Sequence, residues 1–267
     1  MLTTAVILAA GCGRRLMPYT NTRPKCLIEV GDKPLLAHIL DALNTNGFKR
    51  VVIVSGHLSE QLDHYLHQHQ HGLDVTTVYN HRYDTTNNIY SLWLASPWVH
   101  EGFVLIESDL IFDPEALAPF TLPDRIALDH YNPVQHNGTT ALVNENGYLD
   151  DLFLLADGTN DGRKNGARLP TLTESRPLYK TVNISSFSNK TWLRIQSRLE
   201  DFIGREKLDH YYEIVLQGLV RSGKIHLEAI DFSRFWWDEI DSFEDLERVI
   251  LAEKNIKTVD FSDVLRR

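Results

Sequence analysis

The sequence contains few cysteines and nothing that resembles a disulfide framework or a zinc site. Only Cys12 and Cys26 occur among 267 residues, and no CxxC spacing is present. No apolar run is long enough to cross a bilayer, and no basic segment precedes the first short apolar run. These absences argue against a disulfide-rich secreted protein and against a membrane-spanning one, and we expect a cytoplasmic protein.

An excess of positive charge is also lacking. The chain carries 36 acidic and 27 basic residues, a formal net charge of −9. Because nucleic acids and anionic membranes require a basic face, we expect neither as a partner. The 43% hydrophobic content is enough for one substantial core. Without repeats, low-complexity tracts or a linker, the chain is expected to form one domain over residues 1–267.

Apolar runs alternate with helical patterns in the first part of the chain. Buried strands are expected at residues 4–10 and 51–56, further strands at 75–78 and in the apolar run 103–109, and helices at 34–46, 59–69 and 87–95. Ser59 is expected to cap the second of these helices. This alternation predicts an α/β fold with a Rossmann-like, mostly parallel mixed sheet and helices on both faces.

The pattern changes in the second part of the chain. Shorter strands separated by Gly, Asn and Asp turns are expected at 125–131, 138–144, 151–155 and 180–187. Helices are expected at 189–203, 208–222 and 242–254. The single domain would therefore have three parts, which are a first half over 1–119, a β-rich and helical half over 120–241, and a C-terminal helix and tail over 242–267.

The opening stretch ILAAGCGRRLMPYTNTRPKCLIEV, residues 7–30, joins a predicted strand to two glycines and four cations. In open parallel sheets, ligands bind at the carboxyl ends of the strands, where Gly11 and Gly13 fall. Glycines there permit positive φ and close approach of a phosphate to backbone amides. The cations that could neutralise a polyphosphate are Arg14, Arg15, Arg23 and Lys25.

Two other interpretations explain less of this stretch. The dinucleotide fingerprint GxGxxG requires a glycine at its last position, where this chain has Leu16. The acid that this fingerprint requires after the second strand is also missing, since Glu60 lies farther along the chain, beyond a glycine. A tight turn with surface cations would explain either glycine alone, but it leaves the whole pattern unexplained.

The segment AAGCGRRLMPYTNTRPKCLIEVGDKPLL, Ala9 to Leu36, resembles the signature AAGxGxRLxPxTxxxPKxLxxVxxKPLL of nucleotidyltransferases that join sugar phosphates and related phospho-compounds to NTPs. Only Arg14 departs visibly, since Ser or Thr is common there. The resemblance implies the nucleotide-diphospho-sugar transferase type of fold. It also implies catalytic roles for Arg15 and Lys25 on the phosphates, and a carboxylate pair that binds Mg²⁺.

Asp109 and Asp241 are the acids that match this carboxylate pair. They lie 132 residues apart (241 − 109), so they can share one ion only if the segment after the β-rich part folds back onto the first sheet. A helix cap or a salt bridge is the alternative for either residue. Glu107 and Glu239 are weaker metal candidates, each two residues from a better acid.

Other segments narrow the resemblance. TTNNIYSLWLA at 85–95 resembles phosphocholine cytidylyltransferases, in which the asparagines lie beside the nucleotide. NGTTALVN, LYKTVNISSFS, HYYEIVLQ and WWDEIDSFEDL resemble segments of phosphonate cytidylyltransferases. We therefore take 1–119 as the nucleotide-binding half and assign to the nucleotide Leu8, Ala9, Ala10, Gly11, Gly13, Gly56, Asn87, Asn88 and Ser108.

The acceptor is expected to bind in the second half. Lys180 lies among apolar neighbours, where a cation invites an anionic partner such as a phosphonate, and Asn183 could reach a polar group nearby. Aromatic faces with a carboxylate would suit an ammonium group, and the candidates are Tyr211, Tyr212, Trp237 and Glu239. A lysine paired to a structural acid and aromatics packed in a core are the alternatives.

The expected reaction is transfer of CMP from CTP to 2-aminoethylphosphonate or a related phosphonate, with release of pyrophosphate and dependence on Mg²⁺. A phosphonate oxygen is already anionic near neutral pH, so positioning and charge neutralisation are the main requirements. Phosphocholine is the alternative acceptor. A sugar or polyol phosphate nucleotidyltransferase and a non-catalytic nucleotide-binding relative stay open, as does the oligomeric state, a homodimer included.

Overall fold

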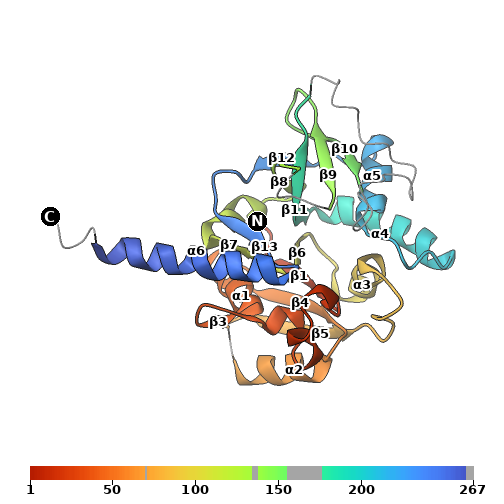
Figure 1. Cartoon of the computed structure of the whole chain (residues 1–267). Helices are drawn as coiled ribbons and strands as arrows, with labels where there is room; N and C mark the ends of the chain where they lie inside the picture. The colour runs from red at the N-terminus through yellow and green to blue at the C-terminus, as the bar shows by residue number, and fades with distance from the viewer. Residues whose placement is uncertain (70, 134–137, 155–175, 263–267) are drawn as a thin grey trace.

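The computed structural model describes residues 1–69, 71–133, 138–154 and 176–262. Figure 1 shows the arrangement of its helices and strands. In chain order they are β1 (Thr4–Ala9), β2 (Glu29–Val30), β3 (Lys33–Pro34), α1 (Leu35–Thr45), β4 (Arg50–Ser55), α2 (Ser59–Gln68), β5 (Asp74–Tyr79), α3 (Asn88–Leu94), β6 (Phe103–Glu107), β7 (Leu110–Phe112), β8 (Arg125–His130), β9 (Thr140–Val143), β10 (Leu149–Phe153), β11 (Tyr179–Phe187), α4 (Asn189–Gly204), α5 (Glu213–Arg221), β12 (Glu228–Asp231), β13 (Trp237–Glu239) and α6 (Phe243–Ser262).

One mixed sheet forms the centre of the fold. Its strand order is β10-β9-β11-β6-β1-β4-β5, and β8 pairs with both β11 and β12. Strands β6, β1, β4 and β5 are parallel, whereas β11 runs antiparallel to β6, β8 and β9. The predicted sheet is confirmed, and the β-rich segment extends it.

Helices cover both faces of this sheet, and the alternation of side chains along β1 shows why. Val6 and Leu8 pack into a core cluster with residues of α3, α4 and α5. Ala5 and Ile7 point to the other face, where the cluster contains residues of α1 and α2. Because both faces are buried, the strand is a continuous apolar run rather than an alternating one.

Most predicted elements are confirmed, with two corrections at helix starts. Ser59 does not cap α2, because Leu58 occupies that position with φ 53° and the turn closes through the backbone, where the Ser59 amide donates to the Gly56 carbonyl oxygen. Helix α5 begins at Glu213 rather than at residue 208. The Tyr212 amide donates to the side chain of Asn88 instead, which holds residues 208–212 outside the helix.

The pairing of β7 with β13 was not predicted, and it shapes the site. These short strands run antiparallel, and the Ile240 amide donates to the Asp109 carbonyl oxygen at 2.9 Å. A third apolar cluster, which includes Leu16, Ile111 and Ile240, packs beneath α6. The segment after the β-rich part is thereby fixed against the end of β6.

None of the helices in the described ranges has the length and apolar character that crossing a membrane would require.

Candidate active site

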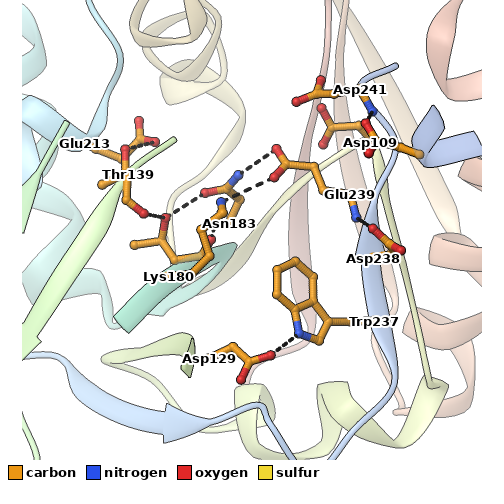
Figure 2. Close-up of polar contacts among 12 residues, drawn as sticks. Asp109, Asp129, Thr139, Lys180, Asn183, Glu213, Trp237, Asp238, Glu239 and Asp241 are labelled. Atoms are coloured by element: carbon orange, nitrogen blue, oxygen red, sulfur yellow. Dashed lines mark hydrogen bonds and ion pairs between the residues drawn. The ribbon is translucent and has the colours of Figure 1, made fainter. Parts of the chain in front are cut away.

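Three carboxylates meet at the carboxyl end of β6. Asp109 lies two residues beyond the end of β6, Glu239 ends β13, and Asp241 lies two residues beyond β13. One carboxylate oxygen from each lies within 4.8 Å of the others. Figure 2 shows the three side chains gathered on one side of the site. The structure therefore brings together Asp109 and Asp241, as the sequence analysis requires for a shared ion, and adds Glu239.

Lys25 lies between two of these acids. Its Nζ is 2.8 Å from Asp109 Oδ2 and 2.6 Å from Asp241 Oδ1, and only 12% of its side chain is exposed. Burial alone would lower the pKa of Lys25, but the two carboxylates outweigh burial and hold that pKa above its usual value. Lys25 is therefore a fixed cation at the end of β6.

Arg15 approaches the same cluster from the solvent side. Its Nη2 lies 2.8 Å from Asp241 Oδ2, and 58% of its side chain is exposed. Burial would raise the pKa of Asp241, but Lys25 and then Arg15 bring that pKa below its usual value. Because exposed ion pairs contribute little to stability, Arg15 can leave Asp241 and bind a phosphate instead at a small cost in free energy.

The cluster has the donor set that Mg²⁺ prefers. Mg²⁺ binds hard oxygen ligands, commonly one or two carboxylates together with phosphate and water oxygens. Asp109 Oδ1 is buried and has no hydrogen-bond partner among the described residues. The three acids pair with Arg15, Lys25 and Lys180, and the unpartnered Asp109 Oδ1 is the oxygen that is available to a divalent ion. Asp109 and Asp241 fit such an ion, with Glu239 as a third ligand.

The structure requires glycine at some of the positions around the end of β1 and not at others. Gly13 has φ 58°, and a Cβ there would lie 2.9 Å from Thr20 Cγ2. A Cβ at Gly56 would lie 2.6 Å from the Ala10 carbonyl oxygen. A Cβ at Gly11 would meet no protein atom within 4 Å, and Gly11 is exposed. Packing thus requires Gly13 and Gly56, whereas Gly11 borders open space where a nucleotide could approach.

The remaining residues assigned to the nucleotide lie at strand ends or at the start of α3. Leu8, Ala9 and Ala10 are buried at the end of β1, and the amide of the buried Ser108 donates to the Leu8 carbonyl oxygen at 3.2 Å. All four are therefore placed beside the glycine turn, where the sequence analysis put them.

The two asparagines bind neighbouring protein groups. Asn87 caps α3, because its side chain accepts from the Asn88 amide at 2.8 Å. The Asn88 side chain donates to Glu107 Oε1 at 3.0 Å and accepts from the Tyr212 amide at 2.8 Å. Asn88 therefore joins the start of α3 to β6 and to the start of α5. Its predicted contact with the nucleotide stays a prediction.

Lys180 and Asn183, both predicted to bind the acceptor, contact the acid cluster through Glu239. Lys180 is buried, and its Nζ lies 3.3 Å from Glu239 Oε2 and donates to the Thr181 carbonyl oxygen at 2.8 Å. Asn183 has φ 60° where β11 is irregular, and its Nδ2 donates to Glu239 Oε1 at 3.4 Å. Lys180 is thus paired to an acid, and that acid belongs to the site.

The three aromatic candidates lie in different surroundings. Tyr212 is buried in the core cluster that contains α3, α4 and α5. Trp237 is partly buried, and its Nε1 donates to Asp129 Oδ2 at 2.7 Å (Figure 2). Tyr211 is partly exposed just before α5. The packing alternative therefore describes Tyr212.

Glu213 was not among the predicted site residues, but in the structure it lies near the predicted acceptor residue Lys180 (Figure 2). Glu213 is the first residue of α5 and is only 7% exposed. Burial raises the pKa of Glu213 to about 6, although its own backbone amide, Lys180, Asn88 and Thr139 act in the opposite direction. The available signal was an acid within the apolar segment HYYEIVL, where a buried charge is unusual.

Glu107 is a further, partly buried acid of the site. Burial, followed by the charges of Asp109 and Glu213, raises the pKa of Glu107 well above its usual value, against the hydrogen bond from Asn88. Its side chain accepts a hydrogen bond from Asn88, which also binds the Tyr212 amide before α5. Glu107 is not one of the three clustered carboxylates.

Comparison with known proteins agrees with this fold. Residues 5–122 match the family described as the MobA-like NTP transferase domain. The chain is 30% identical over 243 residues to the CMP-5'-(3-aminopropyl)phosphonate synthase of Streptomyces rubellomurinus, covering 89% of this chain and 36% of that protein. It is 39% identical over 114 residues to the 2-aminoethylphosphonate cytidylyltransferase of Lancefieldella rimae, covering 42% of this chain and 45% of that protein.

A solved structure shares the fold over almost the whole chain. The CTP:phosphocholine cytidylyltransferase of Streptococcus pneumoniae superposes with a TM-score of 0.76 at 21% identity, covering 94% of this chain and 99% of that one. The sequence alignments span less than half the length of the two relatives named above. Residues 5–122 therefore match a MobA-like NTP transferase domain, and the chain as a whole has the nucleotide-diphospho-sugar transferase fold.

Proposed function

We propose that the protein transfers CMP from CTP to a small phosphonate and releases pyrophosphate. The observation that carries this proposal is the buried Lys25, which joins Asp109 and Asp241 beside the glycine turn at the end of β1. The relatives with cytidylyltransferase and CMP-phosphonate synthase names support the choice of cytosine nucleotide and phosphonate acceptor.

The reaction needs charge neutralisation more than it needs proton transfer. The second pKa of the acceptor lies near ~6–7 by analogy with phosphoserine, so one of its oxygens is anionic at neutral pH. That oxygen forms a bond to the α-phosphorus of CTP, while the bond from the α-phosphorus to the bridging oxygen breaks and pyrophosphate leaves with that electron pair. Two anions must therefore approach one another, and fixed cations lower the barrier.

Lys25 and Arg15 are the residues that we assign to the phosphates of CTP. Lys25 is held by two carboxylates, so its position is fixed before substrate arrives. Arg15 is exposed and has a planar guanidinium that can bind two phosphate oxygens. Mg²⁺, when bound by Asp109, Asp241 and Glu239, supplies further positive charge at the reacting phosphate.

Lys180 is the residue that we assign to the phosphonate group. Its buried ammonium already lies beside Glu239, close to the acid cluster where the metal would bind. An incoming phosphonate could replace the contact to Glu239 and so reach the reacting end of CTP.

Phosphocholine is the second candidate acceptor, favoured by the likeness to the fold of the Streptococcus pneumoniae enzyme. A trimethylammonium group gains most from an open aromatic cage. Here Tyr212 is buried in the core and the Trp237 indole is held by Asp129. These contacts favour the phosphonate over phosphocholine.

The test is pyrophosphate release measured with four NTPs against a panel of phosphonates, phosphocholine and sugar phosphates, with Mg²⁺ present. We expect turnover with CTP and a small aminoalkylphosphonate, and its loss in the Lys25→Met variant. The exposed Lys207, which lies over the Phe202 ring, offers the matched control, and Lys207→Met should retain activity. Turnover with a sugar phosphate alone would overturn the proposal.

A further inference from the structure

Glu213 is a buried carboxylate that the proposed reaction does not use. It starts α5 and is 7% exposed, and its Oε2 is buried with no hydrogen-bond partner among the described residues. Its Oε1 receives a long contact from the Thr139 hydroxyl at 3.5 Å, and its own backbone amide and the Asn88 side chain also interact with the carboxylate. An ionised carboxylate in such surroundings is costly unless it meets a cation or several donors.

Glu213 is connected to the acceptor residues through one side of the site. The Thr139 carbonyl oxygen accepts from the Thr181 hydroxyl at 3.0 Å, and that hydroxyl also contacts Asn183 at 3.2 Å. In Figure 2, Thr139 and Glu213 lie on one side of Lys180 and Asn183, whereas Asp109 and Asp241 lie on the other. The site thus has an acid at each end and a buried cation between them.

The start of a helix offers one reason to place an acid at this position. Negative side chains are favoured in the first turn because free backbone amides and the helix dipole carry partial positive charge. That effect is typically below ~1 kcal/mol, and it is strongest for exposed ends. It explains neither why the carboxylate is buried nor why one oxygen lacks a partner.

We propose that Glu213 binds the ammonium group of the acceptor, which makes it a specificity residue for primary aminoalkylphosphonates. The inference rests on the proposed function. An aminoalkylphosphonate carries an anion at one end and a primary ammonium at the other. With its phosphonate at Lys180 and the metal-binding acids, its ammonium can supply the missing partner of Glu213. A primary ammonium donates three hydrogen bonds, which suits a carboxylate better than an aromatic face does.

The first experiment compares two acceptors on the unaltered protein with CTP and Mg²⁺. 2-Aminoethylphosphonate and ethylphosphonate share the reacting group and differ in the ammonium. We expect kcat/KM to be at least about 30-fold higher with the amine, which is the order that a charge-assisted hydrogen bond provides. Equal use of both acceptors would overturn the role of Glu213 while leaving the proposed function intact. Turnover of neither, nor of any other phosphonate, would overturn both.

The second experiment removes only the charge. Glu213→Gln should lower kcat/KM for 2-aminoethylphosphonate by about 30-fold, mostly through KM, and should leave ethylphosphonate within about twofold. Glu213→Asp keeps the charge and should restore part of the preference. A structural role would instead lower turnover of both acceptors alike, and this result would contradict the proposal. Thermal unfolding of each variant verifies that it is folded.

Discussion

The two ends of the site are built in different ways. The glycine turn with Arg15 and Lys25, which we call the nucleotide end, comes from one continuous stretch after β1. The end formed by Lys180, Asn183, Glu213 and Glu239, which we call the acceptor end, comes from β11, α5 and β13. Backbone geometry determines much of the nucleotide end, whereas side chains from separate elements determine the acceptor end.

This difference has a functional consequence. A substitution within the glycine turn disturbs several backbone contacts at once, as the positive φ and the close contacts of Gly13 show. A substitution at the acceptor end changes one side chain on an element that the core already supports. We therefore expect the nucleotide end to determine turnover and the acceptor end to determine which acceptor is used.

The largest effect is expected where the two ends meet, at the acids that we propose to bind the metal. Asp109→Asn and Asp241→Asn should each lower kcat by on the order of 10³ or more, because several kcal/mol of charge stabilisation depend on the metal. Excess Mn²⁺ should restore only part of the activity. The control is Asp231→Asn, since Asp231 is exposed and pairs with Arg234. Near-normal turnover in either variant would contradict the proposal that this acid binds the metal.

The next effect tests the nucleotide end. Lys25→Met should lower kcat by about 10²–10³, because a fixed donor to the phosphates is lost. It should also lower the midpoint of thermal unfolding, because Asp109 and Asp241 lose the cation between them. Steady-state kinetics with pyrophosphate detection and calorimetry measure the two effects, with Lys207→Met as the control. A stable variant with unchanged kcat would contradict our assignment of Lys25.

A smaller effect is expected for Lys180→Met at the acceptor end. KM for the phosphonate should rise by about 10- to 100-fold, whereas KM for CTP should change less than about threefold. The reason is that Lys180 is assigned to the phosphonate and other residues are assigned to CTP. Lys207→Met is a control, since Lys207 is exposed and lies over the Phe202 ring. If both KM values rose together, the division between the two ends would be wrong.

The smallest effect is a dependence on pH. Glu213 has a pKa near 6 and is faced by Lys180, Glu107, Tyr212 and Thr139. Protonation below that pH removes its charge, so the preference for 2-aminoethylphosphonate over ethylphosphonate should fall severalfold from pH 7.5 to pH 5. The ratio of the two acceptors cancels the titration of the phosphonate itself. Glu213→Gln should show a ratio that is independent of pH.

The sequence predicted the sheet, and it also identified Lys25 and Asp109, which the structure brings into contact. Physical reasons explain both. Buried parallel strands are recognisable as apolar runs, and the glycine turn follows β1 within a few residues. Asp109 was identifiable because it follows such a run. Each of these features is local in the chain, so that the residues that define it are neighbours.

The acceptor end was less predictable because its contacts are not local. The β7–β13 pairing, which brings Glu239 and Asp241 to Asp109, joins three-residue strands that show no periodicity. Glu213 is recognisable as buried only once Asn88 is known to hold the segment before α5. Tyr212 was selected as an aromatic candidate, but its burial depends on how α5 packs, which spacing alone does not show.

The most direct test of the central claim is a competition experiment followed by ³¹P NMR. The protein is given CTP and Mg²⁺ with equal concentrations of 2-aminoethylphosphonate, phosphocholine and glucose 1-phosphate, and the product ratios report relative kcat/KM. We predict a CMP-phosphonate as the main product, exceeding the choline product by about tenfold or more, a difference of ~1.4 kcal/mol. A main product from phosphocholine or glucose 1-phosphate would contradict the account.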